Sequence, residues 1–396
     1  MPRRAGRQKR WMTVAVLAVL PAAFVAAGDG DTDARKWAHV EIKTPRYLIR
    51  TDIEDKWVLR EAEARMTSLA REYDHRIRDF GRKVKRRLPL YMCTDADDYH
   101  AAGGMERSSG MYNGRALLAL ADPIRLRTRR IWHILQHEAW HQYVHTVVGA
   151  RMPIWANEGM AEYFGEGIWT GDGYVTGIIP RWRLKLLKLM IDREAVMPFA
   201  LMLQVTPTQW REDLNMRHYT QAWAMIHFLA HADGEKYRPA LDRYLSEIII
   251  RRRPWHVAFK RAFDGTPADF EERFAEWWKA QDAGATDHLR TKATVATLTS
   301  FLARAVVQGQ SHESAEAFFE AAGAGKLGQL KGQWLPPSLL ARALGNAAKL
   351  EEWSIDARRG LPKLVLELAD GTRFVGTFKR SRTAVEDVSV RIVEPR

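Results

Sequence analysis

Two neighbouring stretches decide the fold of this chain, and they read His137-Glu138-Ala139-Trp140-His141 and Trp155-Ala156-Asn157-Glu158-Gly159-Met160-Ala161-Glu162. An α-helix places the two histidines of the first stretch on one face, close enough to share a metal ion. Glu138 then lies beside the open coordination position, where a general base acts. Ile134, Leu135 and Tyr143 around the motif are uncharged, so we predict a buried helix over residues 130–148. Without a metal, this helix would bury unpaired polar groups.

The second stretch supplies a third metal ligand. A catalytic zinc ion takes three protein ligands and keeps a fourth position for water. Trp155 lies 14 residues after His141, which lets the first helix end and a second helix return antiparallel against it. Glu158 then completes one zinc site with His137 and His141, and Glu162 reaches the far nitrogen of a ligand histidine from behind. The alternative interpretation is that Glu158 and Glu162 are solvated helix carboxylates.

Two further histidines, His133 and His145, continue the four-residue spacing along the same helix. A straight helix cannot direct three successive turns at one tetrahedral ion, so we expect structural or supporting roles for both. A metzincin site would need a histidine six residues after His141, and Val147 occupies that position. The pattern therefore favours a carboxylate as the third ligand.

The motif His-Glu-x-x-His followed by Trp-x-x-Glu-Gly-x-Ala-x-Tyr resembles the gluzincin metallopeptidases, most closely the peptidase-MA-like domains of exported bacterial proteins. The resemblance spans residues 38–280, because the order of elements before the motif and the segment Tyr219-Thr-Gln-Ala-Trp-Ala-Met-Ile-His-Phe-Leu also match. It implies that His137, His141 and Glu158 bind one zinc ion per chain. It also implies that Glu138 activates a water molecule for peptide hydrolysis.

The resemblance further implies two elements that contact a peptide substrate. An edge strand at Leu117, Leu118 and Ala119 would pair with the extended backbone of the substrate. A tyrosine or histidine from a later helix would stabilise the oxyanion of the tetrahedral intermediate. Tyr219 and His218 stand together at the start of such a helix, and we favour Tyr219. A tyrosine of the hydrophobic core is the alternative interpretation of this residue.

Hydrophobic periodicity predicts the remaining elements. Strands are expected within 38–51 and at 88–93, an amphipathic helix over 55–80, a short helix over 95–102, and a hairpin over 109–121 with a type I′ turn at Asn113-Gly114. Helices are expected over 153–164, 181–192, 218–232, 236–251, 254–263 and 267–281. Residues 295–321 have a helical pattern, and residues 362–394 have a strand pattern with a hairpin turn at Asp370-Gly371.

These elements predict an α+β fold. A chain of 396 residues exceeds what a single hydrophobic core organises, so several units are expected. We expect a gluzincin-like catalytic domain over residues 35–285. Its first part, 35–170, would be a small mixed sheet with an edge hairpin packed on the zinc helix, and its second part, 180–285, would be mainly helical. A helical linker and a small β-rich module would follow over residues 290–396.

The N-terminal residues 1–27 have the three parts of a secretory signal peptide. Five basic residues precede an uncharged, mostly apolar run, which ends in Val25-Ala26-Ala27. An uncleaved membrane anchor is the alternative, and in either case we expect the body of the protein to be exported to the periplasm, cell envelope or exterior. Cys93 is the only cysteine, which excludes an intrachain disulfide, and its apolar surroundings predict a structural thiol.

The charge balance indicates the kind of partner. The net charge of +13 becomes +8 when the five basic residues leave with the signal peptide (13 − 5). For an exported chain this favours anionic envelope polymers or a membrane surface over nucleic acid. Solvated helix faces are the plainer interpretation of the same charges. With 46% hydrophobic and 28% charged residues, disordered and fibrous classes are excluded.

Together these patterns predict a zinc-dependent metallopeptidase, in which Glu138 accepts a proton from the attacking water and passes it to the leaving amine. The alternatives are a zinc-stabilised but catalytically idle scaffold of the cell envelope, and an envelope-polymer binder that acts through its basic surfaces or its tail. Glu138 favours the peptidase, because a structural zinc site needs no base.

Overall fold

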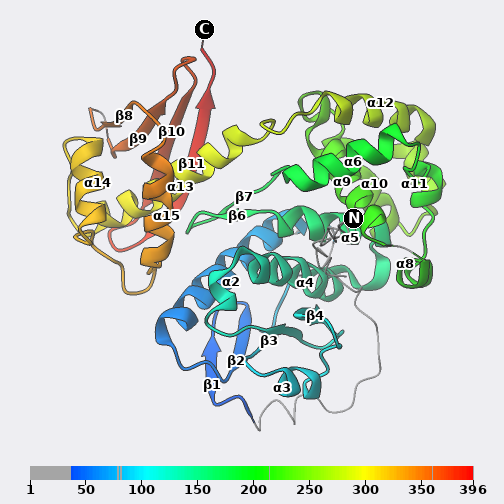
Figure 1. Ribbon diagram of the computed structural model, residues 1–396, viewed down its shortest axis with the longest axis horizontal. Helices are drawn as coiled ribbons and strands as arrows, with labels where there is room; N and C mark the ends of the chain where they lie inside the picture. Colours follow the sequence, from blue (N-terminus) through cyan, green and yellow to red (C-terminus); the bar gives the residue numbers. More distant parts are fainter. Residues whose placement is uncertain (1–36, 78–79, 81–82, 214, 359, 396) are drawn as a thin grey trace, which may run out of the picture.

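The structure is a computed structural model that describes residues 37–77, 80, 83–213, 215–358 and 360–395, with about 52% of the chain in helices. The predicted signal peptide, residues 1–27, lies outside these residues. Within the described ranges, none of the helices combines the length and the apolar character needed to cross a membrane. Figure 1 shows a mixed sheet at the bottom, a group of helices at the upper right and a C-terminal sheet at the upper left. The predicted α+β class is confirmed.

The first part is a five-stranded mixed sheet with the strand order β1-β2-β3-β5-β4. Its strands are β1 (Val40–Lys43), β2 (Tyr47–Thr51), β3 (Leu88–Cys93), β4 (Gly110–Tyr112) and β5 (Leu117–Leu120). β2, β3 and β5 run parallel, whereas the outer pairs β1–β2 and β4–β5 are antiparallel. The parallel pairs need crossovers, which α2 (Lys56–Ile77) supplies between β2 and β3 and α3 (Ala96–Ala101) begins after β3. The amphipathic helix predicted over 55–80 is therefore confirmed.

The strand order corrects the predicted substrate edge. β5 lies between β3 and β4, and Leu117 is paired with Leu90 on one side and with Tyr112 on the other. Leu117, Leu118 and Ala119 are all fully buried. A strand paired on both sides has no free backbone groups for a further strand, so the prediction that β5 is the edge is wrong. Its unbroken apolar sequence is typical of a central strand, and the edge beside β5 is β4.

The predicted β4–β5 hairpin is confirmed, but its turn is not of type I′. Only Gly114 has a positive φ, at 87°, whereas Asn113 does not. The side-chain oxygen of Asn113 instead accepts hydrogen bonds from the backbone N–H groups of Arg115 (3.1 Å) and Ala116 (3.0 Å). An asparagine side chain thus builds this longer loop by bonding to the backbone, which removes the need for a second positive φ.

Two helices at the centre of the molecule carry the predicted metal ligands. α4 (Arg129–Val148) follows the turn η1 (Arg125–Arg127) and lies against β4 and β5. The turn η2 (Gly149–Arg151) reverses the chain into α5 (Ile154–Gly165), which packs between α4 and α9 (Met216–Glu235). A Cβ atom at Gly159 would lie 2.5 Å from the backbone oxygen of Ala222. Glycine at this position therefore allows α5 and α9 to pack backbone against backbone.

The second part is helical, as predicted. A two-stranded hairpin of β6 (Ile168–Trp169) and β7 (Tyr174–Val175) leads into it. Its helices are α6 (Arg181–Asp192), α7 (Phe199–Met202), α8 (Pro207–Asp213), α9, α10 (Arg238–Ile249), α11 (Trp255–Ala262) and α12 (Pro267–Ala280). The sequence pattern did not predict the short helices α7 and α8, because they span too few turns to show a period.

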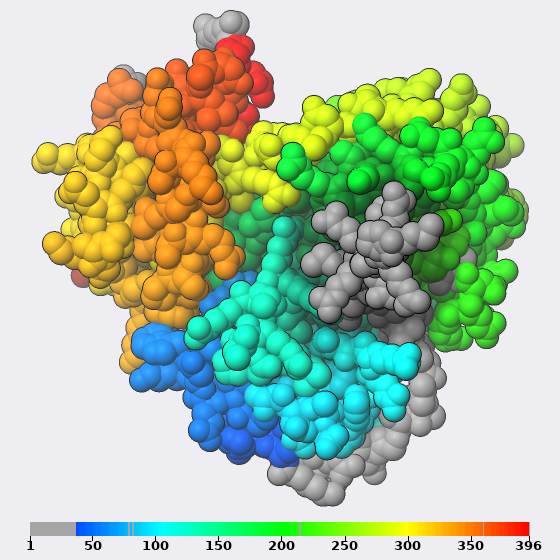
Figure 2. Space-filling model, in the orientation of Figure 1, coloured from blue at the N-terminus to red at the C-terminus, as the bar shows by residue number. Residues whose placement is uncertain are grey.

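The C-terminal module has a sheet of its own, with the strand order β11-β10-β9-β8. Its elements are α13 (Asp287–Val307), α14 (Ala315–Gly323), α15 (Pro337–Ala347), β8 (Trp353–Asp356), β9 (Lys363–Glu367), β10 (Arg373–Arg380) and β11 (Val385–Val393). All pairs in this sheet are antiparallel. Figure 2 shows the module, in yellow to red, seated on the blue N-terminal residues. At this contact the rings of Trp57 in α2 and Trp334 in the module have their centroids 5.7 Å apart. A second contact is the ion pair of 2.7 Å between Arg304 of α13 and Asp172, which lies between β6 and β7.

Cys93 fits the structural role predicted for it. It lies at the end of β3 and is fully buried. Burial raises the pKa of its thiol well above the ordinary value. Because the thiolate is the reactive form, this environment makes Cys93 unreactive.

The contact at Gly159 predicts a large loss of stability when a methyl group is added. In Gly159→Ala, the new Cβ atom meets the backbone of α9, which cannot rotate away as a side chain would. We expect unfolding in urea to become easier by about 1–3 kcal/mol. The control is Gly345→Ala in α15, where a Cβ atom meets nothing within 4 Å. The control should be neutral or stabilising by up to about 1 kcal/mol, and equal urea midpoints for the two variants would contradict the predicted close packing.

Candidate metal centre

The predicted ligands meet at one point between α4 and α5. The Nε2 atoms of His137 and His141 are 3.1 Å apart, and Glu158 Oε2 lies 3.6 Å from the first and 3.4 Å from the second. Tetrahedral bonds of ~2.0–2.1 Å place ligand atoms about 3.3 Å apart, so this triangle has the dimensions of one coordination site. Within the described part of the chain, Glu158 Oε2 has no hydrogen-bond partner although it is buried. The three residues could therefore hold a metal ion.

The charges at this triangle favour an ion pair when no metal is bound. Burial alone raises the pKa of Glu158, but His141 and His137 outweigh this effect and lower it to about 2. Burial conversely lowers the pKa of His141, but the carboxylate of Glu158 raises it to about 9. At neutral pH His141 is therefore protonated opposite an ionised Glu158. A metal ion must displace that proton before it can bind the imidazole.

Glu138 is held apart from the ligand triangle by the edge strand. Its Oε2 accepts a hydrogen bond of 2.8 Å from the backbone N–H of Tyr112 in β4. Burial raises the pKa of Glu138, whereas His137 and His141 lower it, and the net shift is upward. A buried carboxylate with a raised pKa, close to a metal triangle but outside it, has the properties of a proton acceptor. The sequence carries no signal for the Tyr112 contact, because a backbone donor is not marked by residue type.

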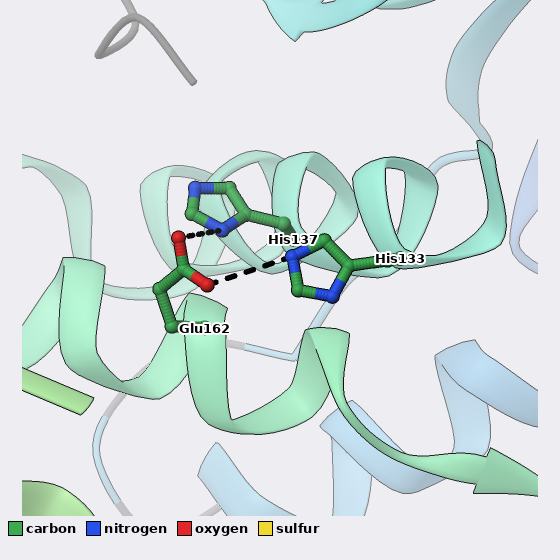
Figure 3. Close-up of side chains that lie close together, drawn as sticks. All are labelled: His133, His137 and Glu162. Atoms are coloured by element: carbon green, nitrogen blue, oxygen red, sulfur yellow. Dashed lines mark ion pairs between the residues drawn. The ribbon is translucent and has the colours of Figure 1, made fainter. Parts of the chain in front are cut away.

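Glu162 lies behind His137, where the sequence places it. Its Oε1 is 3.6 Å from His137 Nδ1, and its Oε2 is 3.5 Å from His133 Nε2. Figure 3 shows the carboxylate between the two imidazoles. Burial raises the pKa of Glu162, but Arg183 reverses the shift and holds it far below the usual range. Glu162 thus stays ionised and can orient the ring of His137.

Arg183 is the residue at this centre that sequence reasoning missed. It projects from α6, is only 2% exposed, and forms an ion pair with Glu162. Its Nε also lies 3.5 Å from Glu166 Oε1. His133, His137 and Glu162 form a second group that could hold a metal ion, but the guanidinium of Arg183 already supplies positive charge there, which disfavours a second cation. Arg183 is one of four basic residues on the amphipathic helix α6, and nothing in the sequence pattern distinguishes it from the other three.

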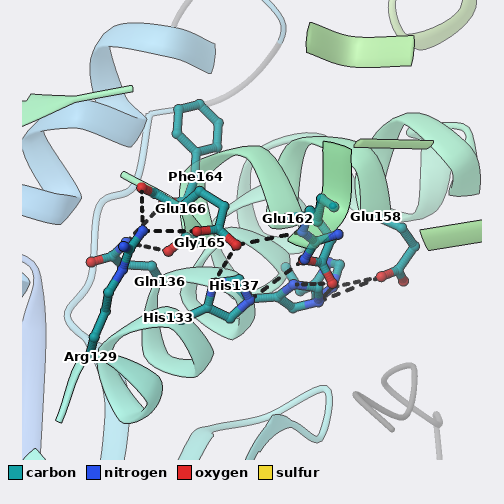
Figure 4. A network of polar contacts seen from close by, with 11 residues as sticks. Arg129, His133, Gln136, His137, Glu158, Glu162, Phe164, Gly165 and Glu166 are labelled. Atoms are coloured by element: carbon teal, nitrogen blue, oxygen red, sulfur yellow. Dashed lines mark hydrogen bonds and ion pairs between the residues drawn. The ribbon is translucent and has the colours of Figure 1, made fainter. Parts of the chain in front are cut away.

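The two outer histidines of α4 contact other residues. His133 Nδ1 lies 3.7 Å from Glu166 Oε1. The other carboxylate oxygen of Glu166, Oε2, accepts a hydrogen bond of 2.9 Å from Arg129 (Figure 4). His145 Nδ1 lies 2.7 Å from the hydroxyl of Tyr112. One histidine therefore supports the carboxylates of α5, and the other supports the edge strand. Both positions agree with the supporting roles predicted for them.

Tyr219 lies on α9 with its ring 5.1 Å from that of Trp210. Its hydroxyl is buried and has no hydrogen-bond partner among the described residues. Burial raises the pKa of Tyr219, and the charge of Glu158 raises it further, so the phenol keeps its proton near the centre. His218 instead accepts a hydrogen bond of 3.1 Å from the backbone N–H of Asn215, as part of the cap of α9.

Comparison with known proteins identifies one domain in the chain. Residues 132–250 match a family described as a protein of unknown function, DUF1570. No curated protein matches the chain. The matched range begins in α4 and ends just after α10, so it contains the three potential ligands, Glu138 and Tyr219. The family carries no assigned activity.

The raised pKa of His141 predicts that metal binding depends on pH. Because the ion must displace a proton from a group whose pKa is about 9, the affinity for a divalent ion should fall about tenfold per pH unit below that value. Calorimetry with zinc at pH 7, in buffers of different ionisation enthalpy, should detect about one proton released per ion. His141→Ala should abolish tight binding, and an affinity that does not change between pH 6 and pH 8 would contradict the ion pair.

Proposed function

We propose that the chain is a zinc-dependent metallopeptidase. The observation that carries the proposal is the arrangement of four buried polar residues, of which three form a ligand triangle and the fourth lies outside it. His137, His141 and Glu158 converge on one point, whereas Glu138 is held outside that triangle by the N–H of Tyr112. A site built only for structural zinc has four protein ligands and no base beside it. A triangle of three ligands with a separate carboxylate suits hydrolysis instead.

The chemistry follows from these residues. Two imidazoles and one carboxylate suit a zinc ion, which when bound would lower the pKa of a water molecule and polarise the scissile carbonyl. Glu138 accepts the proton of the attacking water and delivers it to the leaving amine. Glu162 orients the imidazole of His137, and Arg183 holds Glu162 in place through its ion pair. No covalent intermediate with the enzyme is needed.

The edge strand β4 is the proposed docking site for the peptide backbone. The backbone N–H of Leu120 donates a hydrogen bond to the carbonyl of Ser109, and the backbone N–H of Asn113 donates one to the carbonyl of Ala116. Ser109 and Asn113 therefore direct their backbone groups toward β5. Because backbone direction alternates along a strand, Gly110 and Tyr112 direct theirs away from the sheet. The N–H of Tyr112 is bonded to Glu138, and the remaining outward groups of β4 are placed to pair with an extended substrate.

Tyr219 is the proposed oxyanion stabiliser, because its protonated hydroxyl is unpartnered and within electrostatic reach of Glu158. A gluzincin-like fold over residues 35–285 and an exported location are parts of the same proposal. Their support is the order of elements around the motif and the N-terminal sequence pattern. The substrate would be a peptide or protein, at an envelope rich in anionic polymers or at a membrane surface.

Glu138→Gln provides the direct test of this function. The variant keeps the size of the side chain and the hydrogen bond from Tyr112 but cannot accept the proton of water. We expect cleavage of a peptide library to fall by about 10²–10⁴-fold, with zinc content unchanged. Cleavage by the parent protein should stop when a chelator removes the ion.

The matched control is Glu320→Gln on α14, an exposed change of the same kind far from the centre. This control should cleave the library as the parent does. Undiminished cleavage by Glu138→Gln would exclude the mechanism. A zinc-loaded parent that cleaves no peptide would favour the catalytically idle scaffold, for which the near-complete burial of all three ligands is the supporting observation.

Tyr219→Phe distinguishes an oxyanion stabiliser from a core tyrosine. Because the hydroxyl has no partner among the described residues, its removal should leave the unfolding temperature unchanged. Removal of an oxyanion donor should lower kcat about 10²–10³-fold while KM and zinc content stay the same. An unchanged kcat would assign Tyr219 to the core.

A further inference from the structure

A second cavity lies at the junction of the C-terminal module and the central helices. Its volume is about 460 Å³, and its walls come from the start of α4, the hairpin strand β6, and helices α13 and α15. Apolar side chains form part of its surface, among them Trp132, Trp169 and Leu339. None of the three proposed metal ligands lines this cavity, and neither Glu138 nor Tyr219 does. Its size suits a small ligand with an apolar portion.

Positive charge dominates this cavity. Among the described residues that line it, none is acidic. Six are cationic, namely Arg65, Arg127, Arg129, Arg290, Arg342 and Lys349. Three of them pair with carboxylates outside the wall, whereas Arg127, Arg342 and Lys349 have no ion pair with any residue that the structure describes. These cations, most of them solvent-exposed, give the cavity a positive potential that favours an anionic ligand.

Arg65 is a buried cation that faces this cavity. It is 7% exposed, and its guanidinium lies 4.3 Å from the ring centroid of Trp132 and 4.8 Å from that of Trp169. Glu61 binds one end of the guanidinium at 2.6 Å, but Nε has no hydrogen-bond partner in the described structure. Burial lowers the pKa of Arg65, Glu61 opposes that shift, and the charge of Arg342 adds to it. An unsatisfied buried donor of this kind indicates a missing acceptor.

The first turn of α4 adds to the positive potential. Thr128 and Arg129 line the cavity at the N-terminus of this 20-residue helix. Thr128 does not cap the helix, because its hydroxyl donates to the backbone oxygen of Arg125 at 2.7 Å. No acidic residue stands in the first turn. Uncapped N–H groups at a helix start carry partial positive charge and attract anions.

We propose that this cavity binds a phosphomonoester. Guanidinium groups and a helix N-terminus are the donors that recognise phosphate oxygens in proteins, and the tryptophan and leucine side chains would contact the organic part of the ligand. The phosphate could come from a soluble ester or from a phosphorylated lipid headgroup, which present the same chemistry. The site does not depend on the metal centre or on peptide cleavage.

Calorimetry on the full chain with glycerol 3-phosphate and with inorganic phosphate tests the proposal. The variant Arg342→Gln/Lys349→Gln removes two exposed, unpaired charges from the cavity wall. We expect it to weaken binding about tenfold or more, because each charge-assisted hydrogen bond contributes strongly. The control Lys379→Gln/Arg380→Gln removes two exposed charges from the end of β10 and should bind like the parent. Both variants should unfold at the parent's temperature, since none of the four side chains forms a hydrogen bond or ion pair in the described part of the chain.

A sedimentation assay separates the two possible sources of the phosphate. Vesicles of phosphatidylcholine with phosphatidic acid are compared with vesicles of phosphatidylcholine alone. If the parent binds the soluble ester and only the variant Arg342→Gln/Lys349→Gln loses this binding, the result supports a free ligand. Binding only to phosphatidic acid vesicles, again with loss only in the cavity variant, supports a lipid headgroup. No binding of any probe, or equal losses in the cavity and control variants, would overturn the proposal.

Discussion

Helix α5 buries two carboxylates between α4 and α9, and the rest of the centre depends on how their charge is compensated. Removing a carboxylate from water is unfavourable by several kcal/mol unless positive charge and hydrogen bonds replace the water. His137 and His141 do this for Glu158, and Arg183 does it for Glu162. The compensating groups come from α4 and α6, so these helices must keep their positions around α5. A metal ion would take over the role that the protonated His141 plays without it.

The parts of the centre that could be predicted from sequence are those that local spacing determines. The four-residue interval of His137 and His141 fixes their common face, and the short connection fixes the return of Glu158 against them. Arg183 and the N–H of Tyr112 could not be predicted, because their contacts depend on tertiary packing. The long periodic helices were predicted for the same local reason, whereas the very short helices α7 and α8 were not.

The error at the edge strand has a similar origin. A hairpin pattern shows that two strands pair but not which of them lies beside the rest of the sheet. The wholly apolar sequence of β5 indicated a central strand, yet the resemblance to gluzincins suggested an edge. The prediction of a type I′ turn was wrong for a different reason. The side chain of Asn113 forms hydrogen bonds to the backbone of the loop that a type I′ turn would not need. In both cases the structure follows burial and hydrogen bonding.

Gly159 has a consequence for how the molecule can move. Because α5 has no clearance against Ala222, the backbone that carries Glu158 must travel with α9 and therefore with Tyr219. His137 and His141 instead belong to α4, which lies against the sheet. α4 in turn packs along α5 and joins it through the short turn η2, so the histidines, Glu158 and Tyr219 belong to one packed unit that moves together.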